Sequence, residues 1–131
     1  MDKGHSNDDM VHLTEKIIGA AIEVHRVLGP GYAESVYEEA MATELTLKDI
    51  PFERQKKIRL NYKGHVVGEG RLDLFVDNKV IVELKAIDCI SAIHTAQLLS
   101  YLKMINMSLG LLINFNVSTL RQGIKRVILS K

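Results

Sequence analysis

The chain has 131 residues, of which 47% are hydrophobic and 25% charged, a composition typical of one globular domain and not of a disordered chain. Its 17 Lys and Arg and 16 Asp and Glu leave a net charge of +1, which excludes a bulk attraction for nucleic acid or membranes. The single cysteine, Cys89, excludes an intramolecular disulfide, and no apolar run approaches the roughly 20 residues of a membrane span. We therefore expect a cytoplasmic, soluble protein with a polar tail at residues 1–10 and one domain at 11–131.

The first part of the chain predicts two helices. Apolar residues recur at spacings of three and four over residues 13–28, and Gly29-Pro30-Gly31 ends this amphipathic stretch. A second helix is predicted over about 33–47. The position of Glu34 stays open, because Ser35-x-x-Glu38 fits a capping box that would start the helix at Ser35 and leave Glu34 in solvent.

The middle of the chain predicts an antiparallel meander. Apolar and polar residues alternate over 52–62 and 65–76, on either side of a Lys63-Gly64 turn. Leu72, Leu74 and Val76 are expected on one face of the second strand. A third strand, 80–85, follows the Asp77-Asn78-Lys79 turn.

The last part predicts one more helix and two strands. Helical spacing over about 91–107 places Ile93, Ala96, Leu99 and Leu102 on an apolar side, and Cys89 before it is expected to be a small buried residue. Residues 109–115 and 123–129 are predicted as strands. The order ααβββαββ indicates an α/β (α+β) fold with a mixed sheet flanked by helices.

Two charged residues interrupt the apolar strand 80–85. Glu83 and Lys85 project on the same face, because side chains alternate along a strand. If Asp77-Asn78-Lys79 is a three-residue loop, Asp73 lies opposite Glu83, with Cβ atoms roughly 4.5–5.5 Å apart. Two facing carboxylates repel each other unless a cation lies between them, and such oxygen ligands suit Mg²⁺ or Mn²⁺.

Asp73 and the tripeptide Glu83-Leu84-Lys85 resemble the metal-binding motif of the PD-(D/E)XK nuclease superfamily. Leu72 stands before Asp73 where the superfamily has a proline. Upstream, Gly31-Tyr-Ala-Glu34-Ser-Val-Tyr37 matches the G-x-x-E-x-x-Y signature of the GxxExxY family, a branch of that superfamily. The resemblance covers most of the chain and implies a restriction-endonuclease-like fold.

The resemblance also implies roles for single residues. Asp73, Glu83 and the backbone carbonyl of Leu84 would bind Mg (or Mn), and Lys85 would activate the attacking water and neutralise charge in the transition state. Glu34 would add a carboxylate beside the metal, and Gln97 would position water or a phosphate oxygen. The implied activity is metal-dependent hydrolysis of phosphodiester bonds in DNA or RNA.

Alternative interpretations remain for these residues. Glu83 and Lys85 could form a structural ion pair, Glu38 could replace Glu34, and Gln97 could lie in an exposed polar stripe with His94 and Tyr101. The basic residues of the 52–76 hairpin could bind phosphates or form a solvated face. For the whole chain, the alternatives are a non-catalytic interaction module, including a homodimer, and a hydrolase of a small phosphoester.

Overall fold

A computed structural model describes the backbone of residues 3–130 and the side chains of residues 8–130. The elements follow the predicted order, with one additional 3-10 turn before the last strand. Their bounds are α1 Lys3–Leu28, α2 Glu34–Leu47, β1 Phe52–Tyr62, β2 His65–Val76, β3 Val80–Lys85, α3 Ala92–Met104, β4 Leu109–Asn114, η1 Leu120–Gly123 and β5 Ile124–Ile128.

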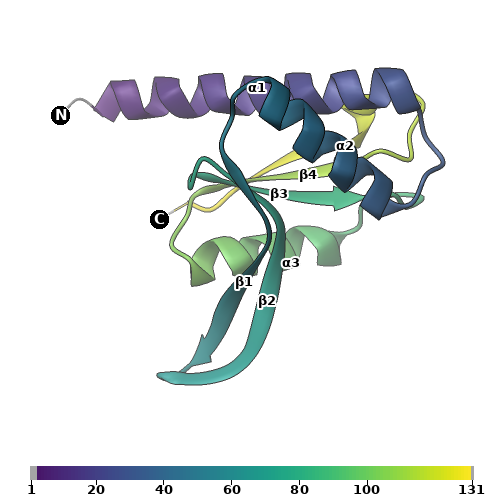
Figure 1. The fold of residues 1–131 in the computed structure, drawn as a ribbon. Coiled ribbons are helices and arrows are strands. Elements are labelled where there is room, and N and C mark those ends of the chain that lie inside the picture. Colours follow the sequence, from purple (N-terminus) through teal and green to yellow (C-terminus); the bar gives the residue numbers. More distant parts are fainter. Residues whose placement is uncertain (1–2, 131) are drawn as a thin grey trace.

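The five strands form one mixed sheet in the order β1-β2-β3-β4-β5, in which only the β3–β4 pair is parallel. Helices α1 and α2 cover one face of the sheet and α3 covers the other (Figure 1). Two buried clusters separate along these faces, one under α1 and α2 and the other under α3. The predicted fold class is confirmed.

The two N-terminal helices form for the predicted reasons, with two differences. Helix α1 buries Leu13, Ile17 and Val24 and ends at Gly29, whose φ of 71° suits glycine. It already begins at Lys3, within the predicted polar tail. Helix α2 begins at Glu34 with Ala33 as its N-cap, so the alternative in which Ser35 starts the helix is not observed.

The β2–β3 hairpin has the predicted register. Val76 pairs with Val80 and Leu74 with Val82, which leaves Asp77, Asn78 and Lys79 as the three-residue loop. Asp77 and Asn78 adopt positive φ values of 52° and 54°, which Asp and Asn tolerate better than most residues. This register places Asp73 beside Glu83.

The face assignment of Leu72 is wrong. Leu72 packs with Ile58 and Phe75 on the α3 side, whereas Leu74 belongs to the cluster under α1 and α2. Across from this switch, Gln55 of β1 has a φ of 51°, in the left-handed region that interrupts regular strand geometry. The regular alternation assumed from the sequence therefore breaks near Asp73.

The apolar side of α3 also differs from the prediction. Leu98 and Leu102 are fully buried, whereas Ile93 is 71% exposed. Leu98 fills the space above Gly110 of β4, where an added Cβ would lie 2.8 Å from the leucine side chain. Cys89 is exposed, contrary to the prediction.

The β1–β2 hairpin extends beyond the rest of the sheet. β1 pairs with β2 from Phe52 to Tyr62, but β2 pairs with β3 only over residues 74–76. The remaining part projects past α3 as a two-stranded arm, defined here as residues 56–71 (Figure 1). Among the described residues, no helix combines the length and hydropathy that crossing a membrane requires.

Candidate active site

Asp73 and Glu83 form the centre of the candidate site through reciprocal hydrogen bonds. The backbone N–H of Asp73 donates to Oε2 of Glu83 at 3.1 Å, and the backbone N–H of Leu84 donates to Oδ2 of Asp73 at 2.8 Å. Each carboxylate thus binds the backbone of the opposite strand and keeps a second oxygen for another partner. The facing pair expected from the sequence register is present in the structure.

Burial makes the charged form of both carboxylates less favourable. Burial and, to a smaller extent, the charge of Asp73 raise the pKa of Glu83 to about 8, against the opposing effects of the Asp73 N–H and the charge of Lys85. Burial likewise raises the pKa of Asp73, which the Leu84 N–H opposes. Two buried like charges side by side favour either a retained proton or a bound cation.

Lys85 lies at the end of β3 and is half-buried. Its charge lowers the pKa of Glu83, Asp73 and Glu34, so the ammonium group lies near all three carboxylates. It forms none of the ion pairs within 4.0 Å that occur among the described residues. Lys85 therefore lies near the centre of the site, and its ammonium group takes part in none of the salt bridges among the described residues.

Glu34 reaches the same site from the first turn of α2. The residue is exposed, yet partial burial of its carboxyl group raises its pKa, with the charges of Asp73 and Glu38 acting in the same direction. The charges of Lys85 and His94 oppose this rise. The structure thus brings Glu34 together with Asp73, Glu83 and Lys85.

Gln97 lies on α3, exposed and with no hydrogen bond among the described contacts of its side chain. It is three residues after His94, which lies close enough to Glu34 for a protonated ring to lower the pKa of that carboxyl group, and four before Tyr101, whose ring packs against Gly70 of β2. Because residues at these spacings share a helix face, Gln97 lies between the site and the arm. His94 itself completes a capping box, its Nδ1 accepting a hydrogen bond from the Ser91 N–H at 2.9 Å.

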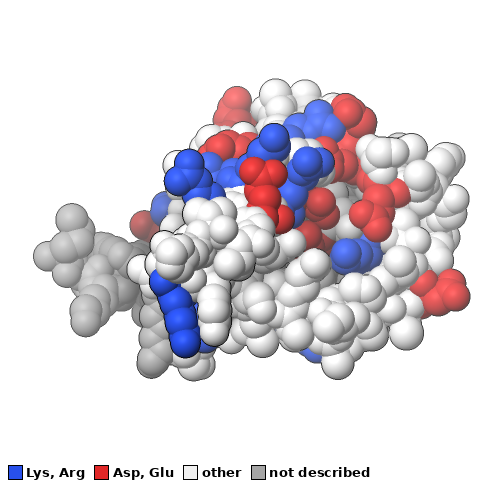
Figure 2. Space-filling view, turned by 90° about the horizontal axis from the view of Figure 1, so that it is seen from below, with Lys and Arg blue, Asp and Glu red and all other residues white. Residues whose placement is uncertain are grey.

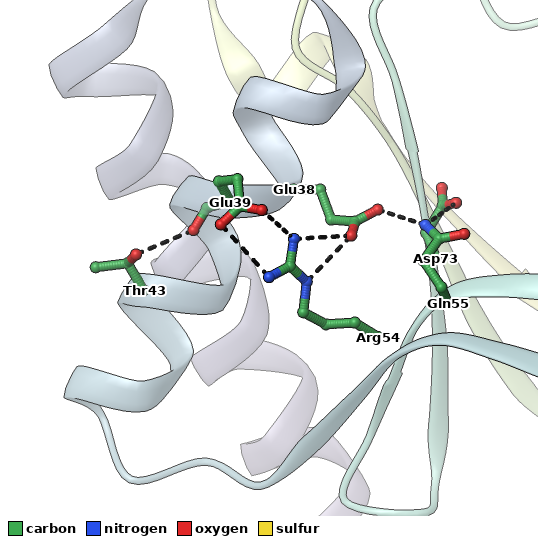
Figure 3. Close-up of polar contacts among 6 residues, drawn as sticks. All are labelled: Glu38, Glu39, Thr43, Arg54, Gln55 and Asp73. Carbon is green, nitrogen blue, oxygen red and sulfur yellow. Dashed lines mark hydrogen bonds and ion pairs between the residues drawn. The ribbon is translucent and has the colours of Figure 1, made fainter.

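A polar network beside Asp73 was not predicted from the sequence. The Gln55 amide donates to Glu38 and, at 3.5 Å, to Oδ1 of Asp73 (Figure 3). Arg54 binds both Glu38, at 3.0 Å, and Glu39, at 2.6 Å, and so fixes α2 against β1. Glu38 is thereby a structural acceptor, while the left-handed φ of Gln55, which no sequence pattern indicated, aims its amide at Asp73.

The donor set fits a magnesium-like ion. Magnesium in proteins is held by one or two carboxylates, with waters and substrate phosphates completing its ligands. Asp73 and Glu83 supply two such carboxylates, and burial raises the pKa of both. In the described part of the chain, no group of three or more His, Cys, Asp and Glu side chains is placed so that it could hold a metal ion, so the protein ligands are limited to this carboxylate pair and the backbone.

Tyr37, the last residue of the G-x-x-E-x-x-Y signature, has a structural role. Its ring stacks on Phe115 with centroids 4.4 Å apart, and its hydroxyl donates to the Gly29 carbonyl at 2.6 Å. The side chain is fully buried and so fixes the α1–α2 connection that presents Glu34.

A mixed sheet between helices, with an Asp and a Glu-x-Lys side by side on one hairpin, defines a restriction-endonuclease-like domain. A family model described as the PD-(D/E)XK nuclease superfamily matches residues 11–127, so the chain belongs to this superfamily. Nucleases of the superfamily generally use divalent metals such as Mg or Mn. No curated protein and no solved structure matches the chain.

Proposed function

We propose that the protein is a metal-dependent nuclease of the GxxExxY branch that hydrolyses phosphodiester bonds of nucleic acid. The observation that carries this proposal is the reciprocal contact of Asp73 and Glu83, with Lys85 beside them, in a chain of the PD-(D/E)XK nuclease superfamily. Asp73, Glu83 and the carbonyl of Leu84 would hold Mg or Mn. The bound ion would polarise the phosphate and lower the pKa of a coordinated water.

The side chains around this centre have distinct roles in the proposal. The Lys85 ammonium stabilises the negative charge that develops on the attacked phosphate and orients the water. Glu34 would add a further carboxylate beside the metal. Gln97, whose side chain makes no hydrogen bond among the described contacts, orients a phosphate oxygen.

The test compares cleavage of DNA and RNA with Mg²⁺ or Mn²⁺ by the wild type and by Lys85→Ala. Loss of one charged donor to the transition state should lower the cleavage rate roughly a hundredfold or more. The melting temperature should change little, because Lys85 takes part in none of the ion pairs among the described residues. Lys103→Ala, at an exposed position of α3, is the matched control. A wild type that cuts neither DNA nor RNA with either metal would overturn the proposal.

A further inference from the structure

The arm concentrates the positive charge of the molecule. Residues 56–71 contain five Lys or Arg and one Glu, a net charge of +4, whereas the whole chain carries +1. The remaining residues therefore have a net charge of −3. Seen from the side on which the arm projects, Lys and Arg side chains gather over this part of the molecule, beside a group of Asp and Glu side chains (Figure 2).

The two faces of the arm have opposite character. Ile58, Leu60 and Leu72 pack on the α3 side of the β1–β2 hairpin, and Gly70 lies under the ring of Tyr101. The residues that alternate with them point away from α3. These are exposed and mostly cationic: Lys57, Arg59, Glu69 and Arg71. Helix α3 thus supports the arm from one face and leaves the basic face open.

The cations of this face are only partly neutralised within the protein, because Arg59 has Glu69 as its cross-strand partner whereas Lys57 and Arg71 face each other. Lys57 and Arg71 are direct cross-strand partners, and like charges in that position repel. Neither these residues nor Arg59 take part in the ion pairs within 4.0 Å that occur among the described residues. A hairpin that keeps such a pair without compensation has a surface suited to an anionic partner.

The basic face lies next to the candidate site along β2. Arg71 precedes Asp73 by two residues of β2, about 7 Å of strand, and Lys57 lies across from Arg71. Arg59 lies roughly another 7 Å along the arm. We propose that the arm binds the phosphate backbone of a nucleic acid duplex next to the cleaved bond. This inference rests on the proposed function, because it assigns the contact for the substrate flanking the site.

The chemistry of the face favours a duplex. Single-strand binding relies on aromatic side chains on which bases stack, and the basic face carries none. A two-stranded β-ribbon fits into the major groove of a duplex. The cations of the arm lie on both of its strands, and a duplex likewise carries phosphates on both strands. Exposed Tyr62, Val66 and Val67 lie near the tip of the arm, away from Arg71, where a protein partner would have to bind.

The experiment measures binding of a fluorescent DNA duplex of about 20 base pairs, and of the matching RNA duplex, between about 50 and 200 mM KCl. It is done in EDTA, so that binding is independent of cleavage. The full-length wild type is compared with Lys57→Gln/Arg59→Gln/Arg71→Gln and with Arg121→Gln/Lys125→Gln/Arg126→Gln. The control variant loses the same charge at exposed positions of η1 and β5.

The steepness of the plot of log affinity against log salt concentration should fall by roughly 2 to 3 for the arm variant, because each lost phosphate contact removes about 0.9. For the control variant it should fall by less than about 0.9. Equal losses in both variants, or unchanged binding by the arm variant, would overturn the inference. Changed self-association of a Val66→Ser/Val67→Ser variant without a binding change in the arm variant would overturn it in favour of a protein partner. Mg²⁺-dependent cleavage is measured separately. If the arm variant still cleaves and binds with unchanged affinity, only the proposal that the arm binds nucleic acid is refuted. If the wild type binds through the arm but does not cleave, only the proposed nuclease activity is refuted.

Discussion

At the scale of single residues, Glu83 couples the stability of the domain to pH. Its folded-state pKa of about 8 exceeds the ordinary 4.5, so the folded protein keeps a proton that the unfolded chain releases. The stability from this proton is complete below about pH 4.5 and is lost as the pH rises to 8, at about 1.4 kcal/mol per unit. Urea unfolding in EDTA should show this decline for the wild type and a flatter profile for Glu83→Gln. Parallel profiles would contradict the assignment.

Asn114 supports the site from the end of β4. Its buried amide accepts from the Ile87 N–H at 3.1 Å and donates to the Ile87 carbonyl at 2.9 Å, which fixes the chain just after Lys85. Asn114→Ala should lower the free energy of unfolding by about 1–3 kcal/mol, because the partly buried N–H and carbonyl of Ile87 each lose a hydrogen bond. Asn116→Ala, whose amide reaches the Ile87 carbonyl at only 3.5 Å, is the control and should cost less than about 1 kcal/mol in urea unfolding. Equal losses would contradict this role.

At the scale of elements, the cross-strand pair of Lys57 and Arg71 in the arm can be tested through its effect on stability. Lys57→Glu replaces a repulsive cross-strand pair with an attractive one opposite Arg71, which should stabilise the protein by about 0.2–1 kcal/mol. Lys57→Gln removes only the repulsion and should lie between this variant and the wild type. Thermal melting at low salt measures the series. A destabilised Lys57→Glu protein would show that the two side chains do not face each other.

The elements also show which features of the fold can be predicted from the sequence. Strand parity fixed the β2–β3 register and hence the Asp73–Glu83 pair, because a slip by one residue would bury the aspartate among valines. The face of α3 was predicted wrongly because its apolar residues fit two stripes. The choice between them depends on Gly110, which leaves room for Leu98, and on Gly70 under Tyr101. Such fits between distant elements are absent from local periodicity.

Some residues of the candidate site could likewise be predicted from the sequence, and others could not. Glu34, Asp73, Glu83 and Lys85 could be found because their types and spacing follow a family motif, and the structure brings them together. The Gln55 contact could not be found, since it depends on a left-handed residue inside a strand whose alternation looked regular. The roles of these residues stay predictions until they are tested by substitution.

At the scale of the whole molecule, metal binding should stabilise the native state, because only the folded hairpin brings Asp73 and Glu83 together. Mn²⁺ at a hundredfold excess over its Kd should add about 2.7 kcal/mol, and raise the melting temperature of a domain of this size by roughly 10 °C. At one fixed Mn²⁺ concentration, the increase should be larger at pH 8 than at pH 6, since Mn²⁺ must displace the proton that Glu83 retains. Asp73→Asn should lose it, whereas Asp88→Asn, an exposed control, should keep it. An equal increase in Asp73→Asn would place the metal elsewhere and separate the two carboxylates from any role in binding it.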